Sequence, residues 1–202
     1  MKILAIPLLV VATAATATKV VGVSLDRLYA ESSSVVSGVI ESGQVLANGC
    51  GVAYKIRVDE NFKGTAKSGD VLTVEKYGPT QIGARYFLFL SPTEEEFQPI
   101  MSTNSGDMAR RAEYINRCKS VRPGYTVNIW GNGALKVTGT YHDSLEDAVI
   151  FDDYLVKPPE QLEVTALKPS ERYDNDQKLT AMELHAFSQH LRELYRSSEA
   201  NN

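Results

Sequence analysis

A succession of short strand patterns separated by turn residues, between positions 52 and 90, most constrains the fold of this chain. In "VAYKIRVDENF" the residues of one face are mainly apolar, and they alternate with Ala, Lys, Arg and Asp. This face is formed by Val52, Tyr54, Ile56 and Val58. A period of two is typical of a strand with one buried and one wet face. The pattern therefore predicts a strand with Tyr54 on its core side.

Two more strand patterns follow. "DVLTVEKY" places Leu72 and Val74 on one side with Glu75 opposite, and "ARYFLFL" is apolar on both faces, as a central strand requires. Turn residues separate the strands at 63–64, 68–70 and 78–79. Together with the β-branched run "VVSGVI" before them, these segments predict a β-meander.

The rest of the chain shows weaker patterns. Ser24 is a candidate N-cap for a short helix in "SLDRLYAE", and "GDMARRAEYINRCK" has helical spacing. "GYTVNIWGNGALKVTGTY" predicts a second hairpin around Gly131-Asn132-Gly133. Residues 141–170 predict an irregular segment with one edge strand.

The C-terminal segment predicts an amphipathic helix after the polar linker "RYDNDQK". Thr180 and Glu183 have the spacing of a capping box. Apolar residues recur at helical intervals at Leu184, Phe187, Leu191, Leu194 and Tyr195. Because such a stripe must be buried to be stable in water, we expect it to pack on the chain's own body rather than on a partner.

The N-terminus has the pattern of a secretory signal peptide. Lys2 precedes an apolar run, and Ala15 and Ala17 form an Ala-x-Ala ending. The apolar run is shorter than the ~20 residues that span a bilayer, so we expect cleavage after Ala17 and no transmembrane segment afterwards. An uncleaved anchor helix is the alternative.

Only two cysteines, Cys50 and Cys118, occur in the chain. A secreted or periplasmic chain meets an oxidising environment, so we expect one disulfide between them. Two separate buried thiols are the alternative.

The charge of the chain disfavours nucleic acid as a partner. Loss of Lys2 with the signal peptide leaves 20 of the 21 basic residues against 25 acidic ones, a net charge near −5. Affinity for nucleic acid comes largely from Lys and Arg on phosphates. We expect a secreted or envelope protein as the partner instead.

The order "VVSGVI", "YKIRVDENFKG", "DVLTVEKYG" and "IGARYFLFL" over residues 24–119 resembles bacterial secreted proteins that share the netrin-like module with the tissue inhibitors of metalloproteinases. Phe62-Lys63-Gly64 and the segment from Gly83 to Phe89 contribute to the resemblance. It implies a small closed barrel of the oligonucleotide/oligosaccharide-binding (OB) type with helices at its ends.

The inhibitory residue of that family is missing. In the metalloproteinase inhibitors the mature chain begins with a Cys that binds the zinc of the target. Here the expected mature start is Thr18-Lys19-Val20. The resemblance therefore does not imply zinc-directed inhibition for this chain.

No set of residues predicts catalysis, a metal or a cofactor. His142, Asp143 and Ser144 are adjacent in sequence, whereas a triad converges from separate elements. His185 and His190 are five apart, whereas helical metal pairs are commonly four apart. The two candidate contact residues are aromatic, Tyr125 and Trp130.

These observations predict a mainly β (α+β) chain: an OB-like barrel with flanking helices, a second hairpin and a C-terminal helix. The expected organisation is a signal peptide at 1–17, the barrel at 18–119, a hairpin and irregular extension at 120–170, and the linker and helix at 171–202. We expect a secreted or periplasmic non-enzymatic binding module. A secreted hydrolase and an envelope assembly factor that docks through its C-terminal helix are the alternatives.

Overall fold

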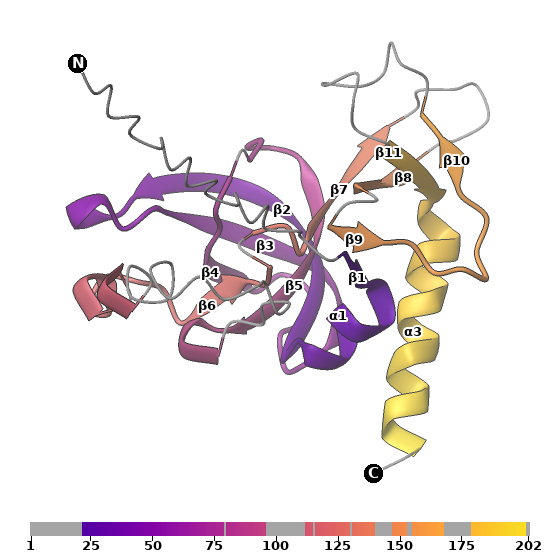
Figure 1. Ribbon diagram of the computed structural model, residues 1–202, viewed down its shortest axis with the longest axis horizontal. Coiled ribbons are helices and arrows are strands. Elements are labelled where there is room, and N and C mark those ends of the chain that lie inside the picture. Colours follow the sequence, from indigo (N-terminus) through magenta and orange to yellow (C-terminus); the bar gives the residue numbers. More distant parts are fainter. Residues whose placement is uncertain are drawn as a thin grey trace, which may run out of the picture.

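The computed structural model has a barrel at one side and a second sheet with a long helix at the other (Figure 1). It describes residues 22–78, 80–95, 112–114, 116–129, 131–139, 147–152, 155–167 and 179–200.

Five strands form the barrel. They are β2 (Ser34–Val45), β3 (Val52–Lys63), β4 (Val71–Glu75), β5 (Arg85–Pro92) and β6 (Tyr125–Val127). Each pairs with the next in the order β2-β3-β4-β6-β5, and β5 pairs back onto β2, so the barrel is closed. The pairing of β4 with β6 is parallel and the others are antiparallel. The expectation of a small closed OB-like barrel is confirmed.

The barrel interior follows the period-two pattern of the sequence. Tyr54, Ile56 and Val58 are buried in its core, whereas Lys55 and Arg57 between them are exposed. The core side predicted for Tyr54 is therefore correct. Two short 3-10 helices, η1 (Ala47–Gly49) and η2 (Thr93–Glu95), lie in the connections after β2 and after β5.

Strand β5 belongs to both halves of the molecule. One of its edges pairs with β2, and the other pairs with β6 and then with β7 (Ala134–Gly139). A second sheet continues from β7 through β8 (Asp147–Asp152) and β11 (Leu179–Glu183) to β10 (Thr165–Ala166). In a separate two-stranded sheet, β1 (Val23–Ser24) pairs with β9 (Val156–Lys157) in parallel.

The turn expected at residues 131–133 does not make a hairpin. β6 and β7 do not pair with each other but lie end to end along β5. The reason is that Asn128 N–H donates to the Phe89 carbonyl, while Phe89 N–H donates to the carbonyl of Gly133. Ile129, Gly131 and Asn132 therefore lie in a turn between the two strands, and the antiparallel pair that does form is β7 with β8.

The extent of the barrel and the order within residues 141–170 also differ from expectation. The barrel closes only with β6, so it extends past residue 119 to Val127. Within the segment expected to be irregular, β8 is an inner strand of the second sheet, with Val149 and Phe151 fully buried. The linker at 171–178 lies outside the described residues.

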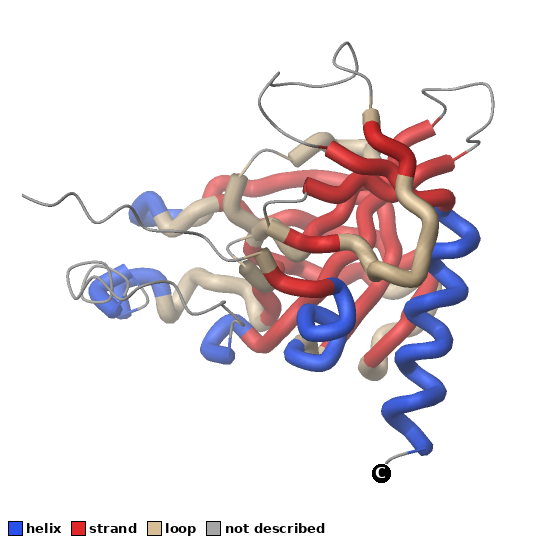
Figure 2. Tube along the Cα trace, turned by 45° about the vertical axis from the view of Figure 1, so that its right-hand side comes forward, coloured by secondary structure: helices blue, strands red, loops and turns tan. Residues whose placement is uncertain are grey.

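Two helices close a second hydrophobic core on the other face of β5. α1 (Leu25–Glu31) begins after Ser24, whose hydroxyl accepts from Arg27 N–H at 3.3 Å, as predicted. α3 (Leu184–Ala200) runs along one side of the molecule in both views (Figures 1 and 2). The core between them includes five phenylalanines: Phe62, Phe87, Phe89, Phe151 and Phe187.

The Phe62-Lys63-Gly64 segment fastens α1 to the barrel. The Tyr29 hydroxyl donates to the Phe62 carbonyl at 2.9 Å. Lys63 Nζ donates to the carbonyls of Tyr29 and Ala30, at 2.9 and 3.0 Å, so its cation lies at the negative end of the helix. This sequence segment therefore has a structural role at the end of β3.

The start of α3 differs from the expected capping box. Thr180 lies inside β11, and the helix begins at Leu184. The carboxylate of Glu183 accepts from the N–H groups of His185 and Ala186, at 2.7 and 2.6 Å. Glu183 is therefore the N-cap of α3. The residues before it, including Thr180, belong to strand β11 and are not available to extend the helix.

Four of the five residues of the predicted stripe of α3 pack on the chain's own body, as expected, whereas Tyr195 is 39% exposed. Phe187 and Leu191 are fully buried, and Leu184 and Leu194 pack against the same core. His190 is buried, with its Nε2 2.9 Å from Asp26 Oδ1 of α1, and the exposed Arg192 forms an ion pair with Glu60.

Substitution of Phe187 by Ala tests how α3 is held. The Phe187 ring makes edge contacts with Phe87 and Phe151, with ring centroids 4.6 and 5.7 Å apart. We expect Phe187→Ala to lower the free energy of unfolding by about 3–5 kcal/mol in urea denaturation, because it removes a fully buried ring. Arg196→Ala, at an exposed position of the same helix, is the control and should change it by less than about 0.5 kcal/mol. A loss below 1 kcal/mol in Phe187→Ala would mean that α3 is not fixed by this core.

Candidate functional site

The two loops that connect the first to the second and the fourth to the fifth barrel strand meet at one end of the barrel. In OB-type barrels these two loops and the adjoining strand faces bind ligands. Here residues 46–51 connect β2 to β3, and residues 93–124 connect β5 to β6. We refer to this end, formed by residues 41–51, 93–95 and 116–124, as the stapled end.

A disulfide joins the two loops. Cys50 lies in the first loop and Cys118 lies at the end of the helical residues 116–118 of the second, with their Cα atoms 5.5 Å apart. Both cysteines are fully buried. The predicted pairing is therefore present, and it crosses 68 positions of sequence to fix one loop against the other.

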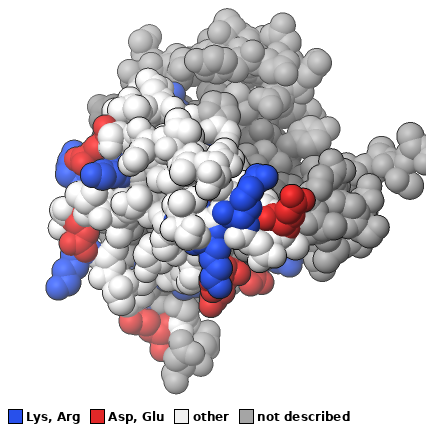
Figure 3. All heavy atoms as spheres, turned by 90° about the vertical axis from the view of Figure 1, so that its left-hand side faces the viewer, with Lys and Arg blue, Asp and Glu red and all other residues white. Residues whose placement is uncertain are grey.

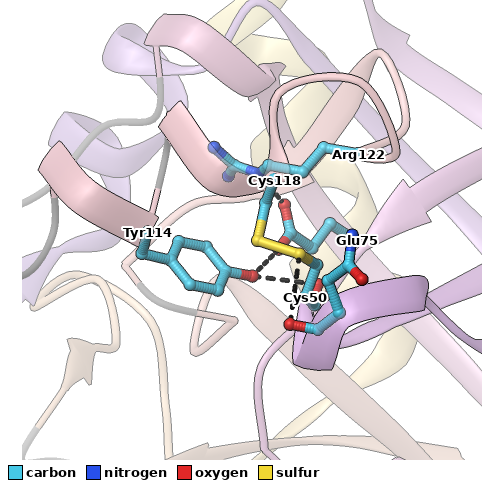
Figure 4. The surroundings of a disulfide bond; sticks show 6 residues. Cys50, Glu75, Tyr114, Cys118 and Arg122 are labelled. Atoms are coloured by element: carbon cyan, nitrogen blue, oxygen red, sulfur yellow. Dashed lines mark hydrogen bonds and ion pairs between the residues drawn. A yellow bond between two sulfur atoms is a disulfide. The ribbon is translucent and has the colours of Figure 1, made fainter.

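A buried carboxylate lies beside the disulfide (Figure 4). Glu75, the last residue of β4, is fully buried and forms an ion pair with the guanidinium of Arg122, which is 4% exposed. Its other carboxylate oxygen accepts from the Tyr114 hydroxyl at 2.7 Å. The same hydroxyl lies 2.9 Å from the Cys50 carbonyl. Both carboxylate oxygens of Glu75 thus contact residues of the second loop. Tyr114 of that loop also lies within hydrogen-bond distance of Cys50 in the first loop.

Aromatic rings shield this carboxylate from water. The rings of Tyr77 and Tyr114 have centroids 6.1 Å apart, and the Arg122 guanidinium lies 5.7 Å from the Tyr114 ring centre. Burial raises the pKa of the Tyr77 hydroxyl, and its hydrogen bonds to Tyr114 and Glu75 raise it further. Burial likewise raises the pKa of Tyr114. Both phenols stay protonated and act as hydrogen-bond donors at neutral pH.

The backbone makes room for this cluster at Gly51. Its φ of +86° is in the region that favours glycine, and a Cβ there would lie 3.5 Å from the Tyr114 hydroxyl. The residue after Cys50 is therefore restricted by its backbone conformation, whereas a Cβ there would make only an ordinary van der Waals contact with Tyr114.

The exposed surface of the stapled end carries both apolar and charged side chains. Residues 41–45 of β2 are all exposed, with Val45 exposed to 76%, and Lys119 forms an exposed ion pair with Glu94. On the face that Figure 3 shows, basic and acidic side chains lie beside one another over a largely uncharged surface.

Of the two predicted contact residues, the structure describes Tyr125 but not Trp130. Tyr125 begins β6 and is half-buried against the barrel core, so it supports the barrel from the edge of the stapled end. Trp130 and His142-Asp143-Ser144 lie outside the described residues. His185 is exposed and His190 contacts Asp26, so the two are not brought together. Within the described part of the chain, no group of three His, Cys, Asp or Glu residues is arranged to hold a metal ion.

Sequence reasoning missed the three polar residues that hold this end together. Glu75 was expected on the wet side of its strand and is instead fully buried. Tyr114 and Arg122 carry no motif, and their role depends on the fold bringing the second loop over the end of β4. The alternating pattern correctly separated the two faces of β4 but did not show that a loop covers the outer one.

Comparison with known proteins adds no family. No protein-family model and no curated protein matches the sequence. Among the described residues, no helix has the length and hydrophobicity needed to cross a membrane.

Breaking the buried ion pair tests the role of Glu75. We expect Glu75→Leu or Arg122→Leu alone to lower the free energy of unfolding by about 3–5 kcal/mol, because each leaves a buried charge without its partner. The double variant Glu75→Leu/Arg122→Leu should recover a large part of that loss in urea denaturation. Glu94→Ala, in the exposed pair with Lys119, is the control and should cost less than about 1 kcal/mol. Losses that simply add in the double variant would show that the two residues do not act as a pair.

Proposed function

We propose that this chain is a secreted or periplasmic, non-enzymatic binding module that contacts a protein or envelope component through its stapled end. The observation that carries the proposal is the Cys50–Cys118 disulfide, because it joins the two loops that OB-type barrels use for binding. A binding surface that is rigid before contact loses less conformational entropy on binding.

The extracytoplasmic location has two supports. The N-terminal sequence has the pattern of a signal peptide, and disulfides persist mainly in oxidising compartments. We propose the compartment on these grounds together.

A netrin-like relationship is part of the proposal and is supported by the strand order of the closed barrel. Zinc-directed inhibition is not proposed, since Thr18 stands at the expected mature start where the metalloproteinase inhibitors have Cys. The partner would instead contact the exposed residues 41–45 of β2 and the loop surface at Lys119 and Glu94.

The alternative in which α3 docks on a partner loses support. Leu184, Phe187, Leu191 and Leu194 of its apolar stripe pack in a core to which α1, β3 and β8 also contribute. The side of the helix that faces outward is mainly polar and includes Arg192, Glu193 and Arg196, with Tyr195 of the stripe 39% exposed.

Photo-crosslinking tests where the partner binds. A benzophenone amino acid at Val45 or Lys119 should form adducts with proteins of the producing cell's envelope or culture fluid. The matched control is Val71, which is 54% exposed at the other end of β4 from Glu75. We expect no adduct from Val71, and weaker adducts from Val45 and Lys119 when Cys50→Ser and Cys118→Ser are introduced, because the loops are then no longer fixed. Equal adducts from all three positions, or adducts from Val71 alone, would contradict the proposal.

A further inference from the structure

The outer part of β2 has a free edge. Residues 41–45 are all exposed and run beside β3 to the left-hand end of the barrel in Figure 1. One edge of this segment pairs with β3, whereas the pairing of β5 with the other edge ends at Val39. Among the described residues, no strand pairs with that second edge beyond Val39. Such an edge is a template for a further strand.

The backbone direction shows which residues face the free edge. Leu46 N–H donates to the carbonyl of Gly51, on the β3 side, at 2.9 Å. Successive residues of a strand point their N–H and C=O groups to opposite edges. The backbone groups of Val45 and Gly43 therefore point away from β3 and toward the free edge.

The other end of the segment gives the same assignment. Ile40 N–H donates to the Ala84 carbonyl, on the edge that β5 occupies. A bulge between Ile40 and Ser42 then inserts one extra residue opposite β3. When the strand is followed from Ile40 across this insertion, Gly43 and Val45 again point to the edge that β5 leaves free. The bulge also interrupts the regular ladder, so a contact on this edge is confined to residues 42–46.

The side chains of this segment fit a second copy of itself. Val45 is 76% exposed and pairs with Val52, and Gly43 pairs with Tyr54 on the same face. A Cβ at Gly43 would lie 2.9 Å from the Tyr54 ring, so the ring occupies the space of a side chain there. An antiparallel copy centred on Gln44 would place Val45 of each chain beside Gly43 of the other, next to its Tyr54 ring.

The charge of the segment also permits self-association. Residues 42–46 are Ser, Gly, Gln, Val and Leu, with no charge and no proline, the residues by which edge strands are commonly protected. Glu41, the nearest charge along β2, is paired with Arg57 at 3.0 Å. Two copies of this acidic protein can therefore meet along the free edge without placing like charges opposite one another.

We propose that two copies of this protein associate through the free edge of β2, in an antiparallel pairing centred on Gln44. Gly43 of each copy pairs with Val45 of the other, and each such pair exchanges two backbone hydrogen bonds. The contact is isologous, with the same residues on both sides. Because only residues 42–46 take part, we expect a contact below the roughly 1,200–2,000 Å² of stable interfaces, and therefore a weak, concentration-dependent dimer.

This proposal does not rest on the function proposed for the stapled end. A partner protein that contacts residues 41–45 would compete with the second copy for the same segment. We therefore expect the dimer to dissociate when such a partner binds.

Sedimentation velocity of the mature protein, from micromolar to millimolar concentration, tests the pairing. The sedimentation coefficient of the unaltered protein should rise with concentration. Val45→Pro removes an N–H that faces the free edge and none that faces β3, so it should weaken dimerisation at least tenfold with an unchanged far-UV circular dichroism spectrum. Val45→Ile keeps the N–H and the apolar side chain, and this control should associate as the unaltered protein does.

Cysteine variants test the register. Gln44 would face its own copy in a non-hydrogen-bonded pair, where Cα atoms lie about 4.5 Å apart, within the roughly 4.4–6.8 Å of disulfides. Gln44→Cys should therefore form an intermolecular disulfide in glutathione buffer, seen on non-reducing gels. Ser42→Cys is also exposed, but its two copies would lie ~13 Å apart along the strands and should not crosslink. Should Val45→Pro fail to fold, this comparison decides the outcome.

Three results would overturn the proposal. They are a monomer at every concentration, unchanged association in Val45→Pro, and equal crosslinking of Gln44→Cys and Ser42→Cys. If the protein stays monomeric while a photo-crosslinker at Val45 reacts only with other proteins, the edge serves a partner, and the function proposed for the stapled end stands without the dimer.

Discussion

The whole structure depends on one strand that is used on both edges and both faces. Leu88 of β5 pairs with Val36 on one side and with Ala134 on the other, so the barrel and the second sheet share it. Its side chains alternate between two cores, with Leu88 and Leu90 in the barrel and Phe87 and Phe89 beneath the helices. Because neither core is complete without β5, the two halves fold as parts of one hydrophobic structure.

The stapled end is held together by a disulfide and polar contacts rather than by a hydrophobic core. A disulfide that closes a loop of 68 residues stabilises the folded chain by about 4 kcal/mol in the chain-entropy model. The buried pair of Glu75 and Arg122 adds little net stability, since removing two charges from water costs about as much as their attraction returns. The pair joins the second loop to the end of β4, and the Tyr114 hydroxyl lies within hydrogen-bond distance of the Cys50 carbonyl in the first loop. Stability comes mainly from the cores and the disulfide, whereas the shape of this end comes from its polar contacts.

The sequence predicted those parts of the fold whose causes are local. Period-two alternation predicted that Tyr54 lies inside the barrel, and Ser24 was predicted as an N-cap. The disulfide between Cys50 and Cys118 was predicted from the expected oxidising compartment. The parts that it did not predict depend on partners distant in sequence. β8 is a strand because β7 and β11 lie on either side of it, and Glu75 is buried because a loop 47 residues later supplies Arg122.

The same reasoning explains the two errors at segment boundaries. Gly131-Asn132-Gly133 has the composition of a hairpin turn, but the flanking strands each find β5 as a better neighbour than one another. Thr180 and Glu183 have the spacing of a capping box, but Thr180 pairs with Phe151 in the second sheet. In both places a long-range strand pairing replaced the structure that the local sequence favours.

Hydrogen exchange is the most direct test of the central claim that the disulfide holds two loops in place on an independently stable body. It compares the unaltered protein with Cys50→Ser/Cys118→Ser. We predict faster exchange of backbone amides in residues 46–51 and 116–124, with protection in β5 and α3 unchanged. Unchanged exchange in both loops, or a uniform loss of protection that includes β5, would contradict this account.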